Sequence, residues 1–263
     1  MFDALYISAT GMQAQQLNVD TIANNLANVN TTGFKKAKVD FSDLVSQGAG
    51  RLAPTPDAAA ALLGDDLRLG AGVGIASVAK LFDLGDLKKT DSAYDLAIQG
   101  DGFLEVLMPD GSSSYTRGGT FKVNRDGLLA TVGGLPLKAN IAIPENAQNL
   151  QIDADGRVRV LVAGQSTAVE AGTLELVRFT NPSGLQAQGD NLYRPSTSSG
   201  EPILAKAAED GMGSFAQGFL EGSNVKMTEE MVNLMVAQRV YEANVKVMQA
   251  SDEMLGMING LRK

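Results

Sequence analysis

The sequence predicts an α+β protein in which helices at the two ends of the chain pair like a coiled coil. A central, mostly antiparallel β-domain lies between them. Two observations predict this fold. Apolar residues recur at steps of three and four near both ends, which is the spacing of one helix face. Between the ends, short β-prone segments alternate with turn sequences, and an extended segment rich in Gly, Pro and Ala completes the expected fold.

The first predicted helix begins at Asp3, a residue type that caps helices, and runs to about Asn28. Gly11 in its interior costs about 1 kcal/mol relative to Ala, so this helix is marginal alone and needs a partner. Packing on a local core is the ordinary interpretation. We favour an intermolecular contact because the next candidate core lies far downstream. The predicted assembly seam on this helix comprises Leu5, Met12, Val19, Ile22, Leu26 and Val29.

The last predicted helix has Thr228 as a candidate cap and acidic residues in its first turn, where the helix dipole favours negative charge. A second apolar line that includes Val240 and Val247 widens its apolar surface beyond a two-helix seam. This width favours contact with more than one neighbour. The predicted seam on this helix comprises Met231, Leu234, Tyr241, Val245, Met248 and Leu255.

The segments between the helices are predicted mainly from turn residues and charge. Lys35, Lys36 and Lys38 are interpreted as a solvated charge cluster, and residues 40–45 as a short helical turn. Residues 46–74 are predicted to form an extended loop. The expected domains are an N-terminal helix (1–30), a connecting segment (31–86), a β-rich outer domain (87–218), and a return segment with the last helix (219–263).

Within the β-domain, strands are expected in residues 104–108, 120–123, 158–162 and 173–179, while residues 181–201 are expected to form a surface loop. Asp153, Asp155 and Gly156 partly match a calcium-binding loop. The third acidic position and the distal Glu of such a loop are missing, so a hairpin turn is the preferred interpretation.

The composition argues against several classes of function. A net charge of −8 argues against nucleic acid as a partner. The chain has no Cys and no His, so it lacks a thiolate nucleophile, the commonest general base and the commonest metal ligand. We therefore expect no enzyme, no cofactor and no metal site. Residues 1–16 lack the basic, apolar and small-residue pattern of a cleaved secretory signal.

Several stretches resemble the axial proteins of the bacterial flagellum, which are its rod, hook and hook-associated subunits. They are residues 23–35 (ANNLANVNTTGFK), 85–103 and 218–225, together with the last helix. Leu104 departs from the second aromatic residue that is common in the family. The signature residues are Asn24, Asn25, Asn28, Gly33, Gly100, Gly102 and Phe103.

This resemblance implies a structural subunit that assembles helically with copies of itself. The terminal helices would form an inner tube and the β-domain an outer layer. Within the family the chain is most similar to a distal-rod subunit of the basal body, because its length fits and residues 46–74 match an extra loop of that subunit. The implied role is a rigid hollow drive shaft that transmits torque from motor to hook.

The resemblance also implies partners and a location. The expected partners are other rod subunits and the hook protein along the axis, the bushing rings around the rod, and the flagellar type III export apparatus. The rod would cross the periplasm, and its subunits would be exported without a cleaved signal peptide.

Alternatives remain. A proximal-rod or hook-type subunit is the rival within the family, although a hook subunit is usually longer. An oligomeric glycan-binding β-domain is the rival from another class, but Tyr94, Tyr115 and Tyr193 are too scattered to indicate an aromatic platform. An enzyme that uses paired carboxylates ranks third, because no pair can be placed in one cleft from the sequence.

Overall fold

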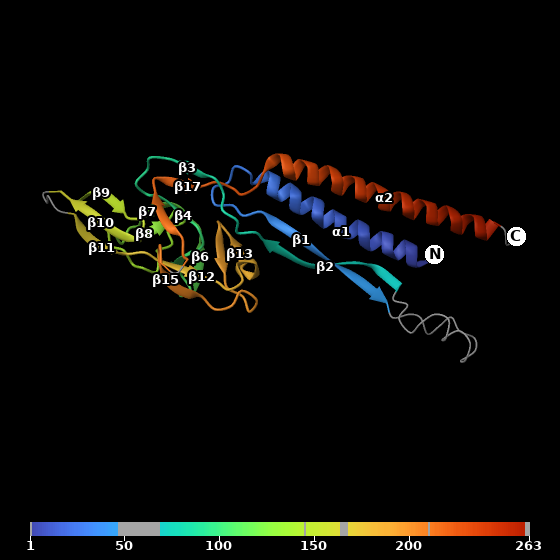
Figure 1. Ribbon diagram of the computed structural model, residues 1–263, viewed down its shortest axis with the longest axis horizontal. Coiled ribbons are helices and arrows are strands. Elements are labelled where there is room, and N and C mark those ends of the chain that lie inside the picture. Colours follow the sequence, from blue (N-terminus) through green and yellow to red (C-terminus); the bar gives the residue numbers. More distant parts are fainter. Residues whose placement is uncertain (1, 47–68, 145, 164–167, 210, 261–263) are drawn as a thin grey trace. The chain divides into compact units, whose positions relative to one another are not determined.

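The computed structural model describes residues 2–46, 69–144, 146–163, 168–209 and 211–260. It confirms the predicted α+β fold, with a helix near each end of the chain and a central antiparallel β-domain (Figure 1). Contacts divide the chain into two units. The first unit comprises residues 1–26, 37–79 and 227–263, and the second comprises residues 27–36 and 80–226.

The first unit contains helix α1 (Phe2–Ala27), helix α2 (Met227–Gly260), and a two-stranded sheet of β1 (Ala37–Ser46) and β2 (Leu69–Lys80). Helix α1 runs alongside α2 and contacts the sheet on its other side (Figure 1). Asn25 Nδ2 in α1 donates to Glu230 Oε2 in α2 at 3.1 Å, and the Val73 N–H in β2 donates to Thr10 Oγ1 in α1 at 3.4 Å. Neither α1 nor α2, the α-helices of the described part of the chain, is long and apolar enough to cross a membrane.

Two sequence predictions about the first unit are wrong. Residues 40–45 belong to strand β1 and form no helical turn, and residues 69–74 of the predicted loop belong to strand β2. The pairing of β1 with β2 joins segments far apart in sequence, which local patterns do not reveal. Gly72 has φ +117°, and a Cβ there would lie 2.4 Å from Thr10 Oγ1. This glycine therefore serves close packing of β2 on α1. Residues 47–68, the rest of the predicted loop, lie outside the described residues.

The second unit is built from short antiparallel strands. They form sheets in the orders β13-β14-β6-β5, β16-β4-β7-β8, β11-β10-β9, β12-β15 and β17-β3. The strands are β3 (Leu87–Lys89), β4 (Asp95–Gln99), β5 (Leu104–Leu107), β6 (Ser113–Thr116), β7 (Gly118–Val123), β8 (Leu129–Thr131), β9 (Ala147–Ile152), β10 (Arg157–Val162), β11 (Val169–Thr173), β12 (Glu175–Arg178), β13 (Gln186–Gly189), β14 (Leu192–Arg194), β15 (Ile203–Lys206), β16 (Ser214–Gln217) and β17 (Phe219–Glu221).

Four of these strands, β5, β7, β10 and β12, lie where the sequence predicts them. The turn before β10 also forms, with the Gly156 N–H donating to the Asp153 carbonyl at 3.0 Å. The loop predicted over residues 181–201 is wrong in part, because it contains the 3₁₀ helix Pro182–Gly184 and strands β13 and β14. Strand β14 contains Leu192 and Tyr193, and their burial within the β-domain explains why this segment is a strand and not a surface loop.

Two clusters of buried side chains hold the second unit together. The larger one is mainly aliphatic, with Phe121 and Phe215, and lies among the sheets that contain β4, β5, β10 and β12. The smaller one is aromatic and includes Phe103, Tyr115, Phe179 and Tyr193, with Phe82 packed against it. Its rings meet edge to face, as between Tyr115 and Phe179 with centroids 4.9 Å apart, which is the favoured geometry for aromatic pairs.

Candidate assembly interface

Helix α2 has one face that packs within its own unit. Glu230, Ala237 and Ser251 are buried on this face. At Gly11 of α1 the two helices approach closely, since a Cβ there would lie 3.0 Å from Asn244 Nδ2. This contact accounts for one side of α2 and leaves the rest of its surface to be explained.

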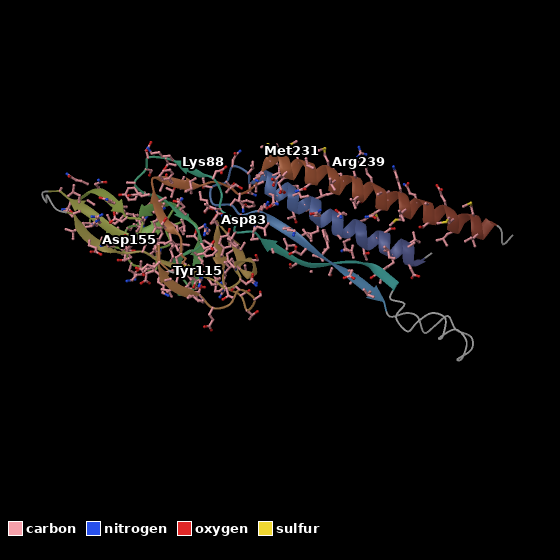
Figure 2. All side chains as sticks on the ribbon, viewed as in Figure 1. Asp83, Lys88, Tyr115, Asp155, Met231 and Arg239 are labelled. Carbon is pink, nitrogen blue, oxygen red and sulfur yellow. The ribbon has the colours of Figure 1, made fainter. Side chains whose placement is uncertain are left out.

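The remainder of α2 exposes many large apolar side chains along its whole length (Figure 2 labels Met231). We call this set the outer face of α2. Its members are Met227, Met231, Val232, Met235, Val236, Val240, Tyr241, Val247, Met254, Met257 and Ile258. Single apolar residues scattered on a surface are ordinary, but eleven large exposed apolar side chains on one helix are typical of an interaction surface. The outer face is therefore the strongest candidate for contact with another molecule.

The predicted seam residues differ in how far a single chain covers them. Ile22 is buried, with 5% of its surface exposed, whereas Met231 and Tyr241 are 51% and 40% exposed and belong to the outer face. The other predicted seam residues are half-buried: Leu5, Met12, Val19, Leu26, Val29, Leu234, Val245, Met248 and Leu255. Their role in contacts between subunits stays a prediction.

Among the signature residues, Asn25 joins three elements of the first unit. Its Nδ2 donates to the Ala37 carbonyl at 2.8 Å and to Glu230 Oε2 at 3.1 Å, and its Oδ1 accepts from the Ala37 N–H at 2.8 Å. Only a side-chain amide supplies donors and an acceptor in this arrangement. Asn24 is exposed, and Asn28 accepts a hydrogen bond from the Thr31 hydroxyl at 3.1 Å.

Lys35 is the centre of a buried ionic cluster in the second unit. Its Nζ donates to Glu221 Oε1 and to the Asp83 carbonyl, both at 2.6 Å, and its side chain has no exposed surface. Arg117 Nε lies 3.5 Å from Glu221 Oε2. The prediction of a solvated cluster is therefore wrong for Lys35, although Lys38 is exposed as expected. Charge runs in one sequence do not reveal which lysine meets a distant carboxylate.

Further hydrogen bonds join residues 31–36, 80–86 and 218–225 around this cluster. The Gly33 N–H donates to the Glu221 carbonyl at 2.7 Å, at a residue whose φ is +71°. The Lys36 N–H donates to Asn224 Oδ1 at 2.8 Å, and Asn224 Nδ2 donates to the Leu81 carbonyl at 2.9 Å. Sequence reasoning missed Asn224, Glu221 and Arg117, whose partners are more than ten residues away along the chain.

The second signature stretch is also organised by Arg117. Its Nη1 donates to the Gly102 carbonyl at 2.7 Å and its Nη2 to the Gly100 carbonyl at 2.8 Å. Both glycines have positive φ, so their backbone can present these carbonyls without the strain that other residues would incur. Phe103 follows directly and anchors the aromatic cluster. These signature residues thus have roles in folding within one chain.

Burial shifts the pKa of several groups near the cluster. It lowers the pKa of Lys35, against the opposing attraction of Glu221, and it lowers the pKa of Lys80. Burial, reinforced by the charge of Glu221, raises the pKa of Tyr193 to about 12. The cluster is thus a buried ion pair whose role is in the folding of the second unit.

The second unit also contains a cavity of about 710 Å³. Its lining is mainly Thr, Gly and aliphatic residues, and its aromatic members Phe34, Phe121 and Tyr193 are buried. Among the described residues, no group of three or more acidic side chains is placed to hold a metal ion. Asp153 and Asp155 of the partial calcium-loop match instead pair with Arg159 and Arg157.

Comparisons with known proteins agree with the resemblance seen in the sequence. Residues 5–35 match the family described as flagella basal body rod protein. Residues 97–160 match the D1 domain of the flagellar hook protein FlgE/F/G family, and residues 216–261 match the C-terminal family of flagellar basal body rod FlgEFG proteins. The matched ranges include α2, most of α1 and part of the β-domain.

Full-length relatives give the same result. The chain is 44% identical to the flagellar basal-body rod protein FlgG of Borreliella burgdorferi, over 100% of both chains. It is 43% identical to FlgG of Buchnera aphidicola subsp. Schizaphis graminum, over 99% of this chain and 100% of the relative. It is 33% identical to the flagellar hook-basal body complex protein FlhP of Bacillus subtilis, over 100% of both. The chain therefore belongs to the flagellar basal-body rod protein family.

Proposed function

We propose that this chain is a structural subunit of the distal rod, which assembles helically with copies of itself into a rigid hollow shaft. The observation that carries the proposal is the outer face of α2, which lies on a helix whose other side already packs within its unit. A helix that is apolar on more than one side belongs inside a larger assembly. The FlgG relatives, matched over their whole length, favour the distal rod over a proximal-rod or hook-type subunit.

Assembly explains how such a subunit transmits torque without chemistry. Heterologous contacts that do not close into a ring produce a helical polymer, and each added copy covers the apolar surface of its neighbours. Torque then passes through many repeated contacts. The proposal extends to contacts with other rod subunits and the hook protein along the axis, with bushing rings around the shaft, and with the type III export apparatus. It places the rod across the periplasm and gives the subunit no enzymatic role.

A glycan-binding β-domain is less well supported. Glycan sites use exposed aromatic faces, but Tyr115 and Tyr193 are buried in the aromatic cluster, which leaves Tyr94 as the exposed member of the three candidates. The aromatic residues that line the cavity are buried as well. The described surface therefore offers this alternative little support.

The test is assembly of the purified protein. We expect tubes in electron micrographs at high protein concentration. The variant Val236→Asp places a charge on the outer face, and because a buried unpaired charge is strongly unfavourable, it should form no tubes while keeping its helix content. Gln16→Glu adds the same charge at an exposed polar position of α1, away from the outer face of α2, and is the control that should assemble. Monodisperse native protein at every concentration would contradict the proposal.

A further inference from the structure

The exposed methionines of the described chain are concentrated on the outer face of α2. Five of the ten methionines lie there, with exposed fractions between 44% and 63%. They are Met227, Met231, Met235, Met254 and Met257. By contrast Met212 is buried, and Met12, Met108 and Met248 are half-buried. The sulfur atoms that solvent reaches most readily are therefore those of the candidate interface.

These thioethers are also the sulfur groups at which an oxidant can act, because the chain contains no Cys. Hydrogen peroxide transfers one oxygen atom to the methionine Sδ. The O–O bond of the peroxide breaks, an S=O bond forms, water leaves, and the sulfur loses two electrons that reduce the peroxide. The product, methionine sulfoxide, is polar where the thioether was apolar.

We propose that the outer face of α2 is a methionine-oxidation site at which peroxide-class oxidants control whether a free subunit can assemble. This inference rests on the proposed function. Met235 lies four residues from Met231 and three from Val232, so these three exposed side chains are neighbours on the helix surface, and a copy packed on Val232 also contacts the Met235 sulfur. Each sulfoxide would bring a strong hydrogen-bond acceptor into a contact built from apolar groups, which disfavours burial.

The same geometry makes the site specific to the free subunit. A copy packed on the outer face removes these sulfurs from solvent, so assembled subunits should oxidise slowly. The modification is reversible by methionine sulfoxide reductases, which require one enzyme for each sulfoxide epimer. Oxidation therefore acts before assembly, and repair restores a competent subunit.

The experiment treats the full-length free protein with hydrogen peroxide, maps sulfoxides by mass spectrometry, and measures assembly by light scattering and electron microscopy. We expect the five outer-face methionines to oxidise before Met12, Met108 and Met212. We also expect the protein concentration needed for assembly to rise about tenfold or more. Peroxide that modifies all methionines at similar rates, or oxidised protein that assembles like untreated protein, would overturn the inference.

The matched variant replaces all five outer-face methionines by Leu, which conserves apolar character, approximate volume and helix propensity. It should assemble and stay competent after peroxide, whereas a Met108→Leu control in the second unit should assemble and remain sensitive. If the five-fold variant does not assemble even untreated, reductase repair of oxidised native protein decides: recovery supports the inference and its absence overturns it. Untreated native protein that never assembles would instead refute the proposed function, while the oxidation map still tests the site.

Discussion

At the scale of single residues, Lys35 should be the most sensitive position in the second unit. Lys35→Met leaves Glu221 in a buried site without its closest cationic partner, which lies 2.6 Å away in the native protein. Breaking a buried ion pair on one side costs about 3–5 kcal/mol. We expect the free energy of unfolding of the β-domain, measured with urea, to fall by about this amount.

Lys38→Met provides the control, because Lys38 is exposed and its pairing with Asp40 lies at the surface. Exposed pairs contribute little to stability. Equal losses of unfolding free energy in the two variants would show that the buried ion pair contributes no more to stability than the exposed one.

Tyr193 should make the second unit sensitive to strong alkali. Burial, with the nearby charge of Glu221, raises the pKa of its phenol from 10.0 to about 12. The folded state therefore keeps this proton while the unfolded state releases it, so the stabilising contribution is full below pH 10 and is lost as pH rises towards 12. A difference of about two units between the phenol pKa of the folded and the unfolded state corresponds to about 2–3 kcal/mol in the free energy of unfolding.

The measurement is urea unfolding between pH 9 and 12, as an approximate range around the phenol pKa. The lysines with lowered pKa, Lys35 and Lys80, act in the opposite direction, because their contribution rises with pH and is complete by about 10.5. Tyr193→Phe should weaken the decline at the upper end of the range. An unchanged decline in that variant would assign it to other groups, including Tyr115, whose pKa burial also raises to about 12.

At the scale of elements, sequence patterns identified both helices and several strands, because each depends on local periodicity or a local turn. Strand β1 was predicted as a helical turn and β2 in part as a loop, since their pairing and the fit of Gly72 against Thr10 are tertiary facts. The ionic cluster was missed for the same reason, as Lys35 and Glu221 are 186 positions apart. The assembly seam was predicted from one heptad stripe, whereas the exposed apolar surface of α2 lies partly beside it.

The element-scale prediction concerns α1. Ile22 is buried within the subunit, so Ile22→Asp removes an apolar contact worth about 2–5 kcal/mol and adds a charge that must be desolvated. We expect α1 to lose protection from hydrogen exchange, while the β-domain, which has its own cores, keeps its protection. Assembly should fail because the subunit loses the helix that supports α2.

Gln16→Glu is the control for this variant, because Gln16 is exposed on α1. It should change neither hydrogen exchange nor assembly. Retained protection of α1 in Ile22→Asp would mean that the site accommodates a carboxylate, contrary to its burial. Comparison with Val236→Asp separates loss of helix packing from loss of a contact between copies.

At the scale of the whole molecule, the kind of symmetry decides how a defective copy affects normal ones. A two-fold dimer uses one patch twice, whereas an open helical polymer joins two different surfaces on every subunit. A Val236→Asp subunit has lost the outer face of α2 and keeps its other surfaces. In a helical polymer it can therefore join a growing end and then offer no site to the next copy.

Small amounts of Val236→Asp mixed into native protein should accordingly shorten the tubes well beyond the loss expected from dilution. Tube lengths in electron micrographs measure this effect, with Gln16→Glu mixed in at the same ratio as the control. A capped end stops growth once for each incorporated variant, so mean length should fall as the variant fraction rises even while most subunits are native. Tubes of native length with all variant protein left in solution would show that the outer face is needed for the first contact as well. In that case the helical arrangement of two separate surfaces proposed here would be wrong.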